Sequence, residues 1–260
     1  MKNNSHHATN VPRILYDPDT APRNAGSGRR IMAKTATQNL LIVYVRMPEP
    51  GQVKTRLAAD VGDEAACELY RAFTDAAIAR GRAVPDTTLR LDYAPDTAAA
   101  CAYFAGRYPG APLAPQLDGG LGARMHASIC SGLSAGHTRV CLMGSDIPDM
   151  PLRNLHAAFQ YLGAHQAVIM PTADGGYCLV GARMPTPEIF DDTRIPWSTP
   201  QVLQATVDIA ARSRIPLAMA PQWHDVDNAA DLAALRLRIR KLPNSDIITP
   251  LRRALAQWAP

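Results

Sequence analysis

An aspartate stands in a short polar segment that directly follows an apolar run. The run covers residues 140–143, and Gly144-Ser145-Asp146 comes next, before Ile147-Pro148. This order predicts a carboxylate at the carboxyl end of a buried strand, the edge at which open α/β sheets bind ligands. Mg²⁺ and Mn²⁺ take carboxylate oxygens together with phosphate oxygens. Asp146 is therefore a candidate metal ligand, although an aspartate that caps the next helix would give the same spacing.

A second candidate is the cationic loop of residues 46–57. Arg46 stands at its entrance, Pro50-Gly51 predicts a turn, and Lys54 and Arg56 follow. Cations and backbone amides after the first strand of an α/β sheet form sites for phosphates. The loop lacks the G-x-x-x-x-G-K-[ST] pattern of a P-loop. A solvated basic loop remains the alternative interpretation.

The segment Asp174-Gly175-Gly176-Tyr177 places a carboxylate beside two glycines. Glycine permits positive φ and a close approach of the backbone to a ligand. Asp-Gly between apolar runs is also a strong hairpin signal. The two interpretations are compatible, so the segment predicts a turn whose Asp174 carboxylate stands at a rim.

A late acidic pair occurs in His224-Asp225-Val226-Asp227. In an extended segment Asp225 and Asp227 face the same side. Two such carboxylates repel each other unless a cation or solvent separates them. The alternative is a turn before a helix, for which Asp227 or Asn228 would be a good cap.

The segment Trp197-Ser198-Thr199-Pro200 carries the signal of a helix start. Ser198 or Thr199 would be the cap, and Pro200 would be the first helical residue. Trp197 either packs structurally or lies over a substrate cleft, and the sequence leaves both open.

Strand and helix patterns alternate along the chain from residue 40 onward. Continuous or alternating apolar runs predict strands at residues 40–45, 88–94, 140–143, 167–170 and 177–180. Helical periodicity predicts helices at residues 64–80, 97–105, 121–133, 152–162, 200–212 and 228–241. This alternation predicts an α/β protein with a mainly parallel sheet covered by helices on both faces.

The composition limits the classes of function. The chain has 260 residues, 47% of them hydrophobic, which is enough for one large domain with a full core. A net charge of +4 with scattered Lys and Arg gives no case for nucleic-acid binding. Five well-separated cysteines, no long apolar span and no signal-peptide pattern predict a cytoplasmic protein without a membrane span.

The domain organisation follows from where the apolar periodicity begins and ends. Residues 1–38 are polar and lack such a period, which predicts a flexible N-terminal extension. Residues 39–242 form the predicted catalytic domain, and residues 243–260 form a C-terminal tail or helix. The sequence leaves the oligomeric state open.

Six short blocks along the chain resemble, in content and order, the DUF2064 family. They are residues 48–57, Leu121-Gly122 with Arg124-Met125, Gly144-Ser145-Asp146-Ile147-Pro148, Asp174-Gly175-Gly176-Tyr177 with Leu179 and Gly181, Trp197-Ser198-Thr199 with Val202-Leu203, and Asp225-Val226-Asp227 with Asp231-Leu232. This family is placed among the GT-A glycosyltransferases of the nucleotide-diphospho-sugar transferase superfamily. Some members are labelled arsenosugar-biosynthesis glycosyltransferases.

The resemblance implies a three-layer α/β/α, Rossmann-like GT-A fold and assigns roles to residues. It implies a catalytic role for Asp146, with Asp146 and Asp227 on Mg²⁺ or Mn²⁺, and a role for Asp174 as acceptor ligand or general base. The residues implied to meet the nucleotide and its phosphates are Arg46, Pro50, Gly51, Lys54, Arg56, Gly122, Arg124 and Ser145. Those implied on the substrate side are Gly175, Gly176, Tyr177 and Trp197.

One loop departs from the expected family pattern. Where the family is expected to read Gln-Gly-x-Gly-Asp-Leu-Gly-Glu-Arg-Met, residues 116–125 read Gln-Leu-Asp-Gly-Gly-Leu-Gly-Ala-Arg-Met. Gly120 and Ala123 replace two acidic positions. Asp118 is a candidate substitute, and the change puts any donor or acceptor contact of this loop in doubt.

These observations predict a metal-dependent glycosyltransferase that uses a nucleotide-diphospho-sugar and a small-molecule acceptor. The alternative is a nucleotidyltransferase that joins an NTP to a phosphorylated small molecule, with the same loop and cation. A third hypothesis is a non-catalytic nucleotide-binding protein on the same scaffold, because fold does not determine function.

Overall fold

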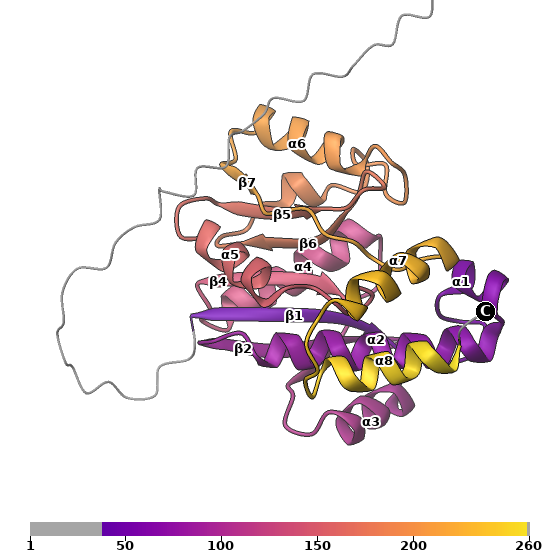
Figure 1. Cartoon of the computed structure of the whole chain (residues 1–260). Coiled ribbons are helices and arrows are strands. Elements are labelled where there is room, and N and C mark those ends of the chain that lie inside the picture. Colours follow the sequence, from indigo (N-terminus) through magenta and orange to yellow (C-terminus); the bar gives the residue numbers. More distant parts are fainter. Residues whose placement is uncertain (1–37, 259–260) are drawn as a thin grey trace, which may run out of the picture. The chain divides into compact units, whose positions relative to one another are not determined.

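The computed structural model describes residues 38–258, which lie within one unit of the chain, residues 36–260. The predicted N-terminal extension, apart from Gln38, lies outside the described residues. A seven-stranded sheet runs through this unit in the order β3-β2-β1-β4-β6-β5-β7 (Figure 1). Its strands are β1 (Asn39–Arg46), β2 (Thr87–Ala94), β3 (Leu113–Pro115), β4 (Arg139–Gly144), β5 (Ala167–Pro171), β6 (Tyr177–Ala182) and β7 (Leu217–Met219).

Strand β6 is antiparallel to both of its neighbours, β4 and β5, and the other pairs are parallel. The prediction of a mainly parallel sheet is therefore confirmed. The β5–β6 pair also confirms the hairpin that the Asp-Gly signal indicated, with a turn in which the N–H of Thr172 donates to the carbonyl of Gly176 at 3.1 Å. The short strands β3 and β7 were not predicted.

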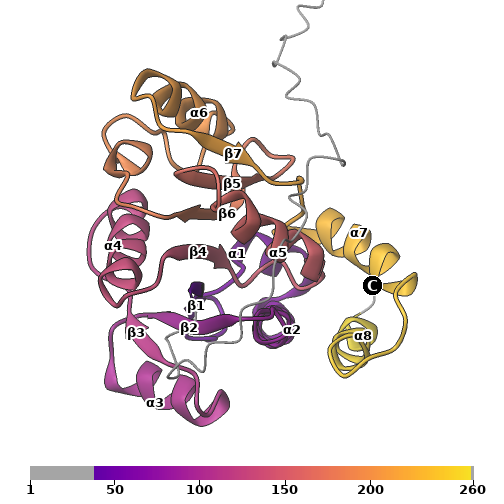
Figure 2. The ribbon, with the colours of Figure 1, turned by 90° about the vertical axis from the view of Figure 1, so that its left-hand side faces the viewer.

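Helices cover both faces of the sheet. They are α1 (Thr55–Val61), α2 (Asp63–Arg82), α3 (Ala98–Arg107), α4 (Leu121–Ser134), α5 (Leu152–Tyr161), the 3₁₀ helix η1 (Pro187–Phe190), α6 (Val202–Arg212), α7 (Ala229–Arg240) and α8 (Ile248–Gln257). Figure 2 shows α4 and α6 on one side of the sheet and α2 and α5 on the other. The predicted three-layer α/β/α class is confirmed.

Strand β1 shows why the central strands read as continuous apolar runs. Leu41 and Val43 pack in the core cluster that contains residues of α2 and α5, whereas Leu40 and Ile42 pack in the cluster that contains residues of α4 and α6. All four are buried because both faces of the sheet are covered. Beyond α2, a further apolar cluster joins α1, α2, α7 and α8, so the predicted C-terminal segment contributes a helix that packs on α2.

The loops that carry the candidate residues meet at the carboxyl edge of the parallel strands. Strands β1, β4 and β5 end there, β6 begins there, and Figure 1 shows α1 and α7 beyond the tip of β1. The N–H of Val226 donates to the carbonyl of Asp146 at 3.1 Å, and that of Trp223 donates to Pro171 at 3.0 Å. The segment after β7 is thereby tied to the ends of β4 and β5.

Buried charged side chains anchor the loop that follows β4. The Arg80 guanidinium donates from Nε to the carbonyl of Pro148 at 2.8 Å and from Nη1 to that of Met150 at 3.0 Å. The buried carboxylate of Asp149 accepts from Arg238 Nε at 2.6 Å and from Trp223 Nε1 at 3.2 Å. Helices α2 and α7 therefore determine the position of the loop that contains Asp146.

Within residues 38–258, no helix combines the length and apolarity that crossing a membrane requires.

Replacing Arg80 by Met tests this support. The change leaves two buried carbonyls without their donors, and we expect the free energy of unfolding, measured by urea denaturation, to fall by about 2 kcal/mol. Arg82→Met is the matched control on the same helix, because its guanidinium reaches one carbonyl, Pro109, at 3.4 Å on the surface. Its expected effect is below about 0.5 kcal/mol. Equal effects of the two substitutions would contradict the anchoring role of Arg80.

Candidate functional site

The side chain of Lys54 lies between the two predicted metal ligands. Its Nζ donates to Asp146 Oδ2 at 2.9 Å and to Asp227 Oδ1 at 2.7 Å. The Lys54 side chain is 8% exposed, whereas the two carboxylates are 31% and 34% exposed. The structure thus brings together Lys54, Asp146 and Asp227, which come from three separate loops.

The electrostatics of this contact favour the charged forms. Burial alone would lower the pKa of Lys54, but the charges of Asp146 and Asp227 outweigh it and raise that pKa. Burial opposes ionisation of Asp146 in the same way, and the Lys54 ammonium holds the pKa of that carboxyl below its usual value. Lys54 has φ 48° and ψ 45°, a left-handed conformation that costs a non-glycine residue about 1–3 kcal/mol. The backbone strain marks this position as a functional candidate.

The alternatives that involved helix caps are now decided. Helix α5 begins after Pro151 and has no side-chain cap, so Asp146 is not a capping residue. Asn228 caps α7 in a capping box with Asp231. The Asp227 carboxylate is therefore not used as a cap, and it accepts from Lys54. The expected cap at Ser198 or Thr199 was wrong, because α6 begins at Val202.

A cleft of about 650 Å³, here called the central cleft, opens at this edge of the sheet. Its lining brings together most of the predicted catalytic and substrate residues. These are Arg56, Asp146, Asp174, Gly176, Tyr177, Trp197 and Asp227, with Leu121, Met125, Ser198, Thr199, Pro200, Val202 and Asp225 beside them. A smaller hollow of about 280 Å³, the inner pocket, adjoins it and shares five lining residues with it: Leu121, Met125, Asp146, Tyr177 and Asp225.

Sequence reasoning left Asp225 unassigned. Its side chain lines the central cleft, the inner pocket and a third hollow of about 330 Å³ that reaches α7. Burial, followed by the charges of Asp146, Asp227 and Asp174, raises the pKa of Asp225 to about 6. The alternation Asp225-Val226-Asp227 was the available signal: Val226 is buried, and both carboxylates line the central cleft.

The turn after β5 carries Asp174 at the rim of the central cleft. Asp174 Oδ1 accepts from Thr172 Oγ1 at 2.5 Å and from the N–H of Gly176 at 3.1 Å. Gly175 has φ 88°, and a Cβ there would lie 2.1 Å from the carbonyl oxygen of Pro200. This close approach explains Gly175 structurally. Its substrate role stays a prediction.

A hollow of about 270 Å³, here called the loop pocket, shares Arg56 and Asp227 with the central cleft. It is lined by Arg46, Gln52, Val53, Lys54, Thr55, Arg56, Tyr70 and Asp227. Lys54 and Arg56, the predicted phosphate-binding cations, therefore line one hollow, and their phosphate role stays a prediction. Pro50 and Gly51 form the turn that shapes the loop, with Gly51 at φ 74°.

Two predicted nucleotide contacts are engaged within the protein. The buried hydroxyl of Ser145 donates to Tyr70 Oη at 3.1 Å, and this oxygen also accepts from the N–H of Arg46 at 2.8 Å. Arg124 Nη1 donates to Gln116 Oε1 at 3.1 Å. These bonds join the ends of β1 and β4 to α2, and the start of α4 to the loop before it.

In the loop that departs from the family pattern, residues 116–125, a carboxylate is supplied by Asp192. Its Oδ1 accepts from the N–H of Gly122 at 2.8 Å and its Oδ2 from that of Ala123 at 3.0 Å. A Cβ at Gly120 would lie 2.3 Å from Asp192 Oδ2. Asp192 therefore occupies the space of a side chain at position 120, and the N–H of Gly122 is already satisfied.

Carboxylates are suitable ligands for Mg²⁺ or Mn²⁺, but the positions of the described side chains limit the predicted metal site at Asp146 and Asp227. Within residues 38–258 no group of three or more His, Cys, Asp or Glu is placed to hold a metal ion. The space between Asp146 and Asp227 holds the Lys54 ammonium. The residues fit a divalent cation only if Lys54 moves and a bound ligand supplies further oxygens.

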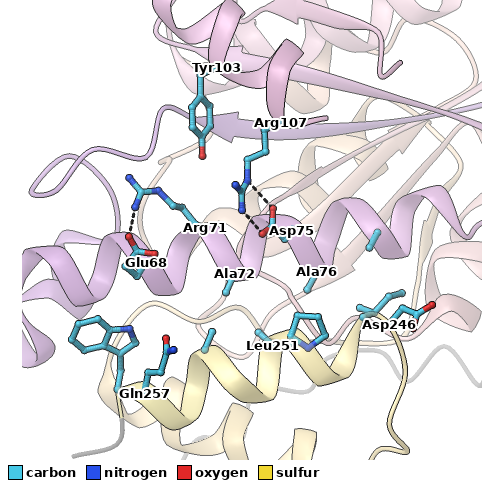
Figure 3. A pocket seen from close by; sticks show the side chains of 15 residues that line it. Glu68, Arg71, Ala72, Asp75, Ala76, Tyr103, Arg107, Asp246, Leu251 and Gln257 are labelled. Atoms are coloured by element: carbon cyan, nitrogen blue, oxygen red, sulfur yellow. Dashed lines mark hydrogen bonds and ion pairs between the residues drawn. The ribbon is translucent and has the colours of Figure 1, made fainter. Parts of the chain in front are cut away.

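A larger hollow, of about 700 Å³, lies away from this site between α2, α3 and α8 (Figure 3). Four of its charged groups form ion pairs, Arg107 with Asp75 and Arg71 with Glu68. None of the predicted site residues lines it. We therefore assign the candidate site to the central cleft and the loop pocket.

The DUF2064 family model, described as an uncharacterized protein conserved in bacteria, matches residues 77–199. A crystal structure from Desulfovibrio desulfuricans G20, provisionally assigned as a nucleotide-diphospho-sugar transferase, is 34% identical. The match covers 85% of this chain and 98% of that one, with a TM-score of 0.77. The chain belongs to the DUF2064 family.

Two more distant structures resemble this DUF2064 protein in fold alone. A 4-diphosphocytidyl-2C-methyl-D-erythritol synthase is 9% identical and a cytidylyltransferase from Leptospira borgpetersenii serovar Hardjo-bovis is 11% identical. Each has a TM-score of 0.50; the matches cover 76% and 85% of this chain and 96% and 94% of the other. No curated protein matches by sequence. The predicted enzyme class, a transferase, is confirmed at this coarse level.

Replacing Lys54 by Met tests the bridge between the carboxylates. Asp146 and Asp227 would then repel each other without their shared counter-ion. Because both are about one third exposed, we expect the unfolding free energy to fall by about 2 kcal/mol, less than for a fully buried pair. Arg56→Met is the control, because that guanidinium lies 3.6 Å from Asp227 and is 74% exposed. The expected effect of the control is below about 1 kcal/mol, and an equally large effect would argue against the bridge.

A double-mutant cycle tests the role of Asp192. Asp192→Ala removes the acceptor for two amides at the start of α4, with an expected cost of about 1 kcal/mol in thermal unfolding. Gly120→Asp should destabilise the native protein by steric and charge conflict with Asp192. In the Asp192→Ala background the same Gly120→Asp change should be neutral or stabilising. Simple additivity of the two effects would show that the sites are independent.

Proposed function

We propose that this protein is a divalent-cation-dependent glycosyltransferase. Its donor is a nucleotide-diphospho-sugar and its acceptor is a small hydroxyl-bearing molecule. The observation that carries the proposal is the position of Lys54, Asp146 and Asp227 between the cationic loop pocket and the central cleft. The family membership supports the same donor class.

The loop pocket is suited to the phosphates of the donor. Arg46 and Arg56 line it with exposed side chains, and Lys54 borders it through its buried ammonium. Once a diphosphate supplies anionic oxygens, Lys54 can exchange a carboxylate for a phosphate without loss of charge pairing. Asp146 and Asp227 would then hold Mg²⁺ or Mn²⁺. The cation, when bound, would neutralise charge on the diphosphate leaving group.

The central cleft is suited to the sugar and the acceptor. In the reaction, an acceptor oxygen forms a bond to the anomeric carbon, and the bond from that carbon to the diphosphate oxygen breaks. The nucleoside diphosphate leaves, and the acceptor proton passes to a nearby base. Asp174 is a candidate for that base, because its Oδ1 is oriented by Thr172 and Gly176 while no described residue donates to its Oδ2.

A nucleotidyltransferase is the second candidate. The observation in its favour is the loop pocket itself, whose three cations could bind the additional phosphate of an NTP. The similarity to cytidylyltransferases does not decide the matter, because at these identities it shows the fold alone.

A melting-temperature panel distinguishes the two candidates. We expect nucleotide-diphospho-sugars with Mn²⁺ to raise the melting temperature, by an amount that grows with the ratio of ligand to its dissociation constant. Protection by NTPs alone would favour nucleotidyl transfer. Asp146→Asn should abolish the Mn²⁺-dependent part of the shift, whereas Asp208→Asn, on the exposed side of α6, should leave it unchanged. Full Mn²⁺ dependence in the Asp146→Asn variant would refute the metal assignment.

A further inference from the structure

The charges that line the central cleft bear on the class of acceptor. Four carboxylates line it, those of Asp146, Asp174, Asp225 and Asp227, and Arg56 is its one cation among the described residues. Lys54, which does not line the cleft, neutralises part of the charge of Asp146 and Asp227. Within the described part of the chain, Asp174 and Asp225 have no such cationic partner. Two of the four carboxylates, Asp174 and Asp225, therefore remain without a cation among the described side chains, and they are not the two that we propose to hold Mg²⁺ or Mn²⁺.

Asp225 is one of these two carboxylates. It borders the central cleft, the inner pocket and the hollow that reaches α7, and no side chain of another described residue donates to it. The other carboxylates that line the central cleft are those of Asp146, Asp174 and Asp227, and carboxylates gathered around one cleft repel each other. An incoming cation or a hydroxyl donor would relieve this repulsion, whereas an incoming anion would add to it.

The remaining lining of the central cleft is aromatic and apolar. Tyr177 and Trp197 stand edge to face, with ring centroids 6.2 Å apart and an angle of 81° between the rings. Leu121 and Met125, at the start of α4, add apolar surface to the same lining. Aromatic faces combined with hydroxyl-binding carboxylates suit a ligand that has both C–H surfaces and O–H groups.

The cations are gathered elsewhere. Arg46, Lys54 and Arg56 line the loop pocket, and of these only Arg56 also lines the central cleft. The two hollows thus differ in charge: Arg46, Lys54, Arg56 and Asp227 line the loop pocket, whereas four carboxylates and Arg56 line the central cleft. An anionic group of a ligand is attracted to the loop pocket and repelled by the central cleft.

We infer that the acceptor is a sugar-like polyol that is neutral or positively charged, and that the carboxylates of Asp174 and Asp225 exclude phosphorylated acceptors. This inference rests on the proposed function, because it takes the central cleft as the acceptor side. It assigns Asp174 and Asp225 as specificity-determining residues for the acceptor.

The test compares three probes of matched shape: glucose, glucosamine and glucose 6-phosphate. Their dissociation constants are measured by calorimetry on the full chain, with and without the nucleoside diphosphate that gives the largest melting-temperature shift. Glucosamine and glucose should bind at least about tenfold more tightly than glucose 6-phosphate at low salt, with a smaller ratio at high salt. In the double variant Asp174→Asn and Asp225→Asn, the ratio of the dissociation constants of glucose 6-phosphate and glucose should approach one.

Both substitutions keep the shape of the side chain, and a melting temperature near that of the native protein verifies that the double variant folds. The single variant Asp225→Asn should lower the ratio in part, and it keeps the test available if the turn at Asp174 does not tolerate the change. Asp208→Asn is the charge control and should keep the native ratio. Glucose 6-phosphate binding as tightly as glucose, no binding of any probe, or an unchanged ratio in the folded variants would each overturn the inference. A nucleotide panel without any melting-temperature shift would instead refute the proposed function.

Discussion

The site depends on one interaction, the contact of the Lys54 ammonium with two carboxylates. It joins Asp146, 92 residues away along the chain, to Asp227, 173 residues away. Without a cation between them, two carboxylates held this close would repel, and the loops that carry them would separate. The left-handed backbone of Lys54 places the side chain in this position. The contact therefore links the start of α1, the end of β4 and the start of α7.

The rest of the fold supports that contact through buried polar groups. Arg80 on α2 and Arg238 on α7 hold the loop after β4 from two directions. Asp192 supports α4 in a similar way. Its carboxylate accepts from two amides at the start of that helix, because Gly120 at the N-cap has no side chain. Charged groups under a site are costly unless they are fully paired, so these pairs keep the loop geometry specific.

The difference in charge between the loop pocket and the central cleft gives the site its chemical character. Cations line the loop pocket, and carboxylates line the central cleft. In a glycosyltransferase this arrangement would separate a charged leaving group from a neutral acceptor. The same arrangement is less suited to a reaction that brings a phosphorylated acceptor into the cleft, which is why acceptor charge and reaction type are linked questions for this protein.

The sequence by itself determined the sheet, most of its helices and the edge where the loops meet. Apolar runs such as residues 140–143 report burial on both faces, and Asp174-Gly175 reports a hairpin, because these signals are local. The resemblance of short blocks also pointed to Asp146, Asp174 and Asp227 as candidate site residues. Only the tertiary structure decided that Lys54 binds two of these carboxylates, that Asn228 is the helix cap, that Asp192 replaces a side chain at position 120 and that Asp225 faces the cleft. Periodicity shows which side of an element is buried, whereas the pairing of charges from distant loops depends on how those loops fold against one another.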